Sequence, residues 1–251
     1  MKKSISVLVL FALVAAGAIA QQFSFGVGII GVNNLGIATT TFKDEQVNPW
    51  GDPMVGKDEI KYKKSTNTAQ AIDFGGFLFF DATYAELSIS LGGGSLHWMY
   101  PEYNAFKMGL GLLGKFPIEV GGSGLTIAPL LGIDYDIVLG AQDEYGNKVA
   151  AGDKDKGTGI ILYDGKENNI PKLKNGAVSD FSALSLKLGA EAKFPITDSM
   201  YLSSQFLWGI RFNSAYETAL LNQQNDSGGD NFSSELFTHG TTFKLAVGFK
   251  L

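Results

Sequence analysis

The chain has no cysteine among its 251 residues, so no disulfide can stabilise it. A chain of this length without such cross-links must be held by a packed core or by a closed hydrogen-bonded sheet. Glycine, in contrast, is plentiful at 32 residues, and aromatic residues make up 12%. Both values are high for a globular protein and favour β-sheet.

Positive charge is also in short supply. The formal net charge is −5, and no basic stripe runs along any segment. Nucleic-acid binding depends on lysine and arginine side chains that neutralise phosphates, so we expect no nucleic-acid partner. After the first twenty residues there is no run of about 18 apolar residues, which excludes a transmembrane helix there.

Residues 1–20 have the layout of a secretory signal peptide. Two lysines open the segment, an apolar stretch follows, and Ala18-Ile19-Ala20 fits the rule for cleavage before Gln21. The apolar stretch is too short for a membrane-spanning helix, and the absence of cysteine excludes a lipoprotein anchor. We therefore predict Sec-dependent export and a mature domain over residues 21–251. Its net charge falls from −5 to −7, because the two lysines leave with the signal.

The mature chain alternates between apolar and polar residues, which is the pattern of a half-buried β-strand. The pattern recurs in eight segments, around Phe25, Phe74, Leu87, Leu110, Ile133, Leu188, Phe206 and Val247. Segments of about ten to fourteen residues can cross a bilayer at a tilt near 45°. Lipid offers no partner to a free strand edge, so the first strand must pair with the last. The predicted fold is an all-β, eight-stranded, antiparallel, up-and-down transmembrane β-barrel with long extracellular loops.

Charged residues indicate which strand face points inward. A lysine on the lipid face near the bilayer midplane costs about 2–4 kcal/mol, so the face that carries Lys187 must line the interior. The same register predicts a lumen charge network of Asp73, Glu86, Lys107, Asp134, Asp136, Lys187, Glu191, Arg211 and Lys244. Mixed signs allow these groups to pair and to fill the narrow interior of eight strands. A hairpin turn over residues 117–123 would bring Lys107 opposite Asp134.

The connections alternate between short and long, as an outer-membrane barrel requires. Short turns are expected near residues 81–82, 117–124 and 195–199. Long loops are expected over residues 33–68, 93–103, 140–180 and 213–240. The sequence Lys-Phe-Pro-Ile occurs at 115–118 and again at 193–196, each time at a strand end, where proline leaves no ladder hydrogen bond unmade. Both termini then lie on the periplasmic side.

Three motifs could carry chemistry, and each has a plainer explanation. Gly109-Leu-Gly-Leu-Leu-Gly114 has the glycine spacing of a dinucleotide-binding motif. That motif needs a helix N-terminus to bind the phosphates, whereas these glycines are expected within a strand, where they leave room inside the barrel. Asp153 and Asp155 resemble the start of a calcium loop that lacks its glycine and final glutamate. His239 lies near Ser234 in sequence, which is weak evidence for an enzyme. We expect no catalytic, cofactor or metal site. The aromatic cluster over 98–103 favours an interfacial girdle, with ligand contact as the alternative.

The strand pattern resembles the small outer-membrane barrels of the OmpA, OmpX and OmpW type over the whole mature chain. The resemblance implies a monomer in the outer membrane of a Gram-negative-type bacterium, delivered by periplasmic chaperones and the barrel-assembly machinery. The terminal strand matches the signal read by that machinery, with Phe243, Leu245, Val247, Phe249 and Leu251 on one face. Leucine at the last position departs from the usual phenylalanine.

Two functions remain open at this point. The barrel can be a structural or surface-interaction protein, with a charge-filled lumen and outer loops that meet an extracellular ligand. Alternatively, it can be a narrow channel for small or hydrophobic solutes, as the OmpW-type resemblance implies. The inward-facing Leu113, Leu130 and Leu207 would suit an apolar path, whereas the interior charges argue against one.

Overall fold

The computed structural model describes residues 22–43, 62–97, 100–142, 178–218, 221 and 232–251. Several predicted features lie outside this part of the chain. They are the signal peptide over residues 1–20, the acidic residues Asp153 and Asp155, and Trp98 and Met99 of the predicted aromatic cluster.

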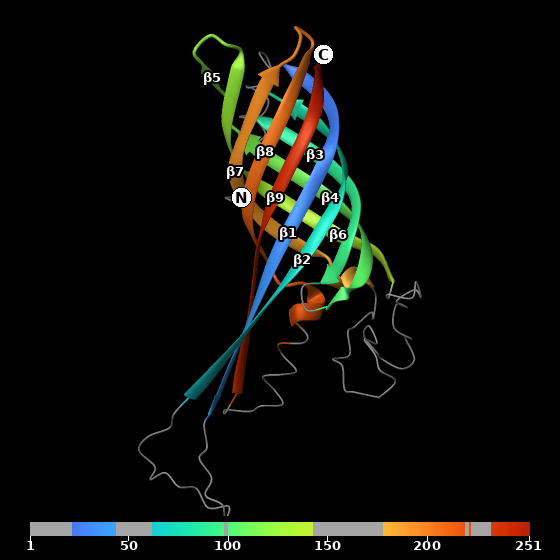
Figure 1. Cartoon of the computed structure of the whole chain (residues 1–251), viewed down its shortest axis with the longest axis vertical. Coiled ribbons are helices and arrows are strands. Elements are labelled where there is room, and N and C mark those ends of the chain that lie inside the picture. The colour runs from blue at the N-terminus through green and yellow to red at the C-terminus, as the bar shows by residue number, and fades with distance from the viewer. Residues whose placement is uncertain (1–21, 44–61, 98–99, 143–177, 219–220, 222–231) are drawn as a thin grey trace, which may run out of the picture.

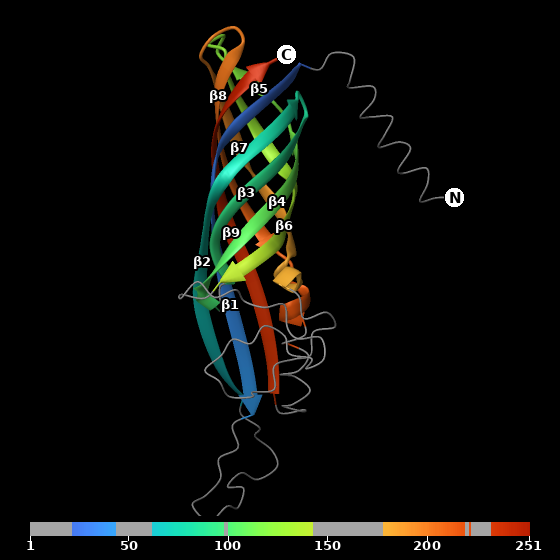
Figure 2. The ribbon, with the colours of Figure 1, turned by 90° about the vertical axis from the view of Figure 1, so that its right-hand side faces the viewer.

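The strands form one closed ring. The sheet order is β4-β3-β2-β1-β9-β8-β7-β6-β5, and β6 also pairs with β4, so the sheet closes on itself (Figure 1 and Figure 2). Because β5 is a three-residue piece that pairs only with β6, the ring itself has eight strands. All pairings are antiparallel, and β1 is joined to β9. The predicted eight-stranded, up-and-down architecture and its closure are confirmed.

Each strand follows an alternating segment of the sequence. The bounds are β1 Phe23–Lys43, β2 Tyr62–Ala82, β3 Ala85–His97, β4 Tyr100–Lys115, β5 Ile118–Val120, β6 Leu125–Gln142, β7 Ala183–Pro195, β8 Met200–Arg211 and β9 Phe232–Lys250. Two short helical pieces accompany them in the described chain, the 3₁₀ helix η2 (Val178–Phe181) and a single turn over residues 215–218. No helix among the described residues is long and apolar enough to cross a membrane.

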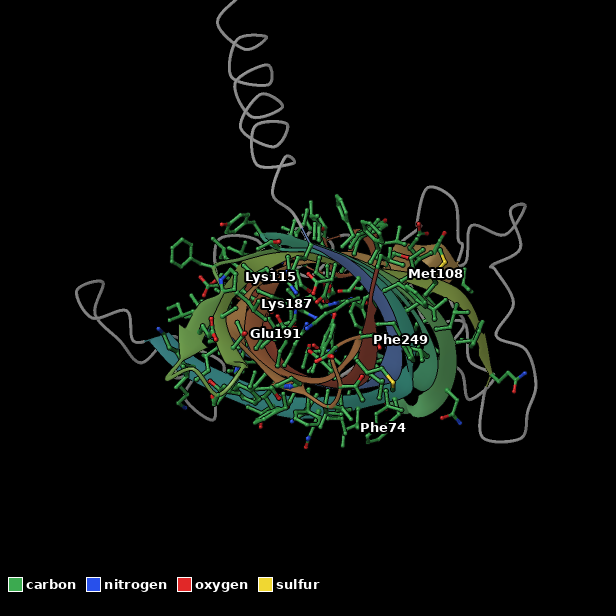
Figure 3. All side chains as sticks on the ribbon, turned by 90° about the horizontal axis from the view of Figure 1, so that it is seen from above. Phe74, Met108, Lys115, Lys187, Glu191 and Phe249 are labelled. Atoms are coloured by element: carbon green, nitrogen blue, oxygen red, sulfur yellow. The ribbon has the colours of Figure 1, made fainter. Side chains whose placement is uncertain are left out.

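The distribution of polar and apolar side chains is the reverse of that in a water-soluble protein. Apolar side chains cover the outside, where Phe74 is 70% exposed and Leu188 is 52% exposed. Inside, Glu86 is 1% exposed. Viewed down the barrel, Lys115, Lys187 and Glu191 lie within the ring, and Phe74 points away from it (Figure 3).

The short turns lie at one end of the barrel, but two of them begin later than predicted. β2 continues through Ala82, so the first turn is at residues 83–84. The second turn occupies residues 121–124, because β5 pairs with β6 from Ile118 to Val120. Gly121, Gly122 and Gly124 have φ of 61°, 69° and 74° there, a left-handed conformation that favours glycine. The turn between β7 and β8 lies within the predicted range.

At the opposite end, the strands extend into regions that were expected to be loops. β1 runs to Lys43 and β2 begins at Tyr62, with continuous pairing to that end, so much of the expected loop over 33–68 is strand. Likewise β3 and β4 occupy most of 93–103, and β9 begins at Phe232 rather than after residue 240. As a result, β1, β2 and β9 project beyond the other strands (Figure 1).

Candidate functional site in the barrel interior

The inner end of the lumen, near the short turns, is closed by charged side chains. The ammonium of Lys115 lies 3.0 Å from a carboxylate oxygen of each of Asp81, Glu86 and Glu191. All four side chains are at most 2% exposed. Gln205 adds amide hydrogen bonds to Glu86 and Glu191, of 2.6 and 3.2 Å. We call Asp81, Glu86, Lys115, Glu191 and Lys193 the inner cluster.

The two copies of Lys-Phe-Pro-Ile meet in this cluster. Lys115 and Lys193, the first residues of the two copies, bind different oxygens of Asp81. Lys193 also lies 4.9 Å from the centre of the Tyr201 ring, whose hydroxyl is 2.6 Å from that of Ser24. The sequence repeat therefore reflects two strand ends that direct equivalent lysines onto one carboxylate.

Further along the lumen lie two more ion pairs. Lys187 binds Asp134 and donates a hydrogen bond of 2.9 Å to Thr242. Lys107 contacts both carboxylate oxygens of Asp73 at 2.9 Å and donates to the Ser95 carbonyl at 2.7 Å.

The predicted pairing of Lys107 with Asp134 is wrong. Lys107 lies opposite Val138, and Asp134 lies opposite Gly111. The turn after β5 begins later than expected, so the register between β4 and β6 is displaced. Each of the two charges pairs with a different partner instead.

Buried apolar side chains pack beside these charged groups. Leu113, Leu130 and Leu207, which could have lined an apolar path, pack together and are 0–4% exposed. On the opposite wall, a second cluster contains Phe77 and Phe79. The phenylalanine rings lie where side chains of Gly26 and Gly28 would otherwise be.

The outer end of the described lumen is covered by an arrangement that the sequence analysis missed. Arg211 contacts both carboxylate oxygens of Glu217, at 3.1 and 3.0 Å, and donates to the Phe181 carbonyl at 2.8 Å. Ser214 and Glu217 form a reciprocal capping box at the helical turn. The rings of Phe181 and Tyr216 stack at 4.3 Å. The spacing Ser214-x-x-Glu217 is a readable helix-start signal inside what was expected to be a loop. We call these five residues the outer cover.

The remaining predicted network residues also face the interior. Lys244 is 2% exposed and lies 3.6 Å from Glu86 and 3.2 Å from the Ser88 hydroxyl. Asp136 lines two small cavities, of about 40 and 20 Å³, and no described residue forms an ion pair with it. A larger recess of about 170 Å³ opens at the inner end, beside Lys193 and Tyr201.

The other candidate motifs do not assemble into a site. On β9, Ser234 is buried and hydrogen-bonds Thr40, whereas His239 lies on the opposite face near the rings of Trp208 and Phe237. Gly109 and Gly111 lie within β4 and are buried, alternating with exposed leucines. Among the described residues, no three histidine or acidic side chains converge on a metal position.

The residues predicted to form the assembly signal line the outer face of the closing strand. Phe243 is 48% exposed and Leu251 is 77% exposed, and buried residues such as Thr242 and Lys244 alternate with them. The ring of Phe249 stacks on Phe25 across the seam between β9 and β1, at 5.5 Å. These residues therefore lie where the barrel closes.

Comparisons with known proteins were made for the whole chain. No protein-family model and no curated protein matches it. Among solved structures, the chain is similar to the outer membrane protein OprG from Pseudomonas aeruginosa, with 10% identity, 92% of this chain and 96% of that chain covered, and a TM-score of 0.38. For Neisserial surface protein A the identity is 7%, the coverage 88% and 97%, and the TM-score 0.37. For Ail of Yersinia pestis the identity is 10%, 89% of this chain and 99% of that chain are covered, and the TM-score is 0.29. The chain's own strand pairing establishes its fold, an eight-stranded, antiparallel, up-and-down barrel.

Proposed function

We propose that this chain is an integral outer-membrane barrel with a sealed lumen, which acts as a surface-interaction or structural protein rather than as an enzyme. The observation that carries the proposal is the inverted polarity of the barrel. Phe74, Leu131 and Leu188 expose 52–70% of their surface outside, whereas Glu86 and Glu191 are 1–2% exposed inside. In water such an exterior would be a large apolar patch, which soluble monomers avoid. In lipid it is the expected apolar band.

Layered contacts along the interior support a sealed lumen. The inner cluster, the Lys187–Asp134 pair, the Lys107–Asp73 pair and the outer cover follow one another between the two ends. An eight-stranded barrel has an interior just wide enough for side chains to fill. The filled interior favours this function over the narrow channel.

The orientation follows from the connections. Short turns in bacterial barrels face the periplasm, so β1, β2 and β9 project on the outer side. The projecting part of β1 is rich in threonine, with Thr39, Thr40 and Thr41 in succession. We assign it to contact with an extracellular ligand. The other partners in this proposal are outer-membrane lipid, periplasmic chaperones and the barrel-assembly machinery.

Reconstitution tests the proposal directly. The full chain, purified from membranes, is inserted into lipid vesicles, and folding is verified by a gel mobility that boiling changes. We expect a folded barrel with ion and small-solute flux no greater than that of protein-free vesicles. Reproducible flux from the folded protein would contradict the sealed lumen and support the channel. Recovery of the folded chain in water without detergent would contradict the membrane assignment.

A further inference from the structure

Among the buried and half-buried side chains that the described strands and the outer cover direct into the barrel, acids outnumber cations by one. Lys250 also faces inward, but it is exposed at the rim of the recess beside Lys193. The carboxylates are Asp73, Asp81, Glu86, Asp134, Asp136, Glu191 and Glu217. The cations are Lys107, Lys115, Lys187, Lys193, Arg211 and Lys244. Each cation lies within 3.6 Å of a carboxylate in this set, and these ion pairs account for every acid except Asp136. This described set therefore carries one negative charge in excess, located at Asp136.

An unpaired charge inside a barrel is costly unless a counter-charge accompanies it. Asp136 is partly buried and lies on the inward face of β6, between the buried residues Asp134 and Val138. Neither nearby cation can form an ion pair with Asp136 without giving up an existing one. Lys107 makes two contacts with Asp73, and Arg211 makes two contacts with Glu217. Taking either cation away would leave another carboxylate unpaired.

Asp136 lines two cavities, and each is also lined by a residue that has a buried oxygen atom without a hydrogen-bond partner. The Oγ1 atom of Thr238 has no hydrogen-bond partner, although the residue is only 1% exposed, and it lines the smaller cavity, of about 20 Å³. The Oδ1 atom of Asp134 is likewise unpartnered and lines the larger cavity, of about 40 Å³. Buried oxygen atoms of this kind are normally satisfied by water, an ion or a protein donor.

The strand register adds a hydroxyl group to this set. Ser90 on β3, Gly109 on β4 and Asp136 on β6 lie side by side across three strands. A Cβ atom at Gly109 would lie 3.3 Å from the Asp136 Oδ1 atom and would collide with the Ser90 hydroxyl. The glycine therefore leaves space between a carboxylate and a hydroxyl that project from its two neighbouring strands.

We propose that the space beside Asp136 is a binding site for one monovalent alkali cation, with Asp136 as its charged ligand. Ser90 and the Asp134 Oδ1 atom are candidate oxygen donors from the larger cavity, and Thr238 is a candidate donor from the smaller one. Oxygen ligands suit hard cations. A single excess negative charge matches a single positive charge. Lys107, Lys187 and Lys244 line the larger cavity, and each already pairs with another carboxylate, so only one negative charge is left for an ion to balance. The site goes beyond the proposed function, since it does not depend on whether the lumen conducts or the loops bind a partner.

Thermal unfolding of the purified full chain in detergent micelles tests the site. Unfolding is followed in sodium, potassium, lithium and choline chloride at equal ionic strength and pH. We expect one alkali cation to raise the Tm of the wild type in a saturable way, as a ligand of the folded state does. Choline, which is too large for the cavities, gives no such rise. Asp136→Asn removes the cation-specific rise, and Thr238→Val weakens the apparent affinity several-fold. Asp198→Asn, in the exposed turn between β7 and β8, is the matched control and keeps the wild-type response.

Three results would overturn the proposal. The first is a Tm that depends equally on all four salts, and the second is a cation-specific rise that persists in Asp136→Asn. The third is stability that responds to pH through Asp136 and not to the identity of the cation, because a bound proton would then balance the charge. Crystals grown with rubidium or thallium give a direct check, since an anomalous peak beside Asp136 is expected in the wild type and not in Asp136→Asn.

Discussion

At the scale of single residues, Lys115 has the largest expected effect on stability. It is 1% exposed and contacts three carboxylates. Removing one partner of a buried ion pair typically costs about 3–5 kcal/mol, because the remaining charge stays buried. We expect Lys115→Met to lower the free energy of unfolding by about that amount, measured by urea titration in lipid vesicles. Lys250→Met, at an exposed position of β9, serves as control and leaves stability unchanged. Equal stability of the two variants would show that the inner cluster contributes little.

For single residues, the side of the strand could be predicted from the sequence, but the interaction partner could not. Alternation places Lys187 and Glu191 on the inward face without any knowledge of partners. Partners depend on turn positions and on the shape of the whole ring. Lys193 on β7 binds Asp81 on β2, and these strands are not neighbours in the sheet. No pattern along one strand contains that information. The pairing of Lys107 failed because the turn after β5 was placed too early.

At the scale of elements, the core of each of the eight ring strands was predictable, but several strand ends and the short strand β5 were not. β1 continues to Lys43 through Thr39, Thr40 and Thr41, where neither face is apolar. Backbone pairing with β2 and β9 continues there without any alternation of apolar and polar residues to reveal it. The hydrophobic pattern thus marks the part of a strand that meets an apolar environment, and not where hydrogen bonding ends.

Close approach between strands gives a prediction for β7. A Cβ atom added to Gly189 would run into the carbonyl oxygen of Phe206 on β8, whereas nothing lies within 4 Å of the same position at Gly140 on β6. We expect Gly189→Ala to reduce the folded fraction, because the two strands must separate locally, and Gly140→Ala to leave it unchanged. The fraction of heat-modifiable protein after refolding into vesicles measures both. Similar yields for the two variants would contradict a tight contact at Gly189.

The outer cover gives a second prediction at this scale. Glu217→Gln removes the charge that holds Arg211, so the helical turn over 215–218 should separate more easily from the barrel. Because the chain has no cysteine, Val138→Cys provides a single thiol in the cavity beneath the cover. We expect a thiol reagent added from outside to label Cys at 138 slowly, and faster when Glu217→Gln is also present. The exposed Thr66→Cys should label at one rate in both backgrounds. A labelling rate at 138 that does not respond to Glu217→Gln would mean that the cover does not limit access.

At the scale of the whole molecule, one closed sheet has to satisfy two environments. Backbone groups pair around the ring, so no strand edge is left within the cylinder and lipid can surround it. The inner faces of the eight strands carry apolar side chains such as Leu113 and Leu207 beside many charged ones. Ion pairs occupy much of the interior. Burying a charge costs free energy, and this cost is offset only when an opposite charge lies beside it. A single unmatched acid such as Asp136 therefore points to a counter-ion.

Because apolar side chains cover the outside of the barrel, the depth of an outward-facing residue in the bilayer can be tested by substitution. Leu188 and Leu184 lie on one face of β7, near the middle and near the outer end, and both are at least 39% exposed. An arginine on the lipid face costs about 2–4 kcal/mol at the midplane and about 0–1 kcal/mol near the interface. We therefore expect Leu188→Arg to destabilise the folded barrel in vesicles by about 2–4 kcal/mol, and Leu184→Arg to have an effect of about 0–1 kcal/mol. If the two variants are equally stable, the middle of β7 does not lie in hydrocarbon, and the membrane assignment fails with it.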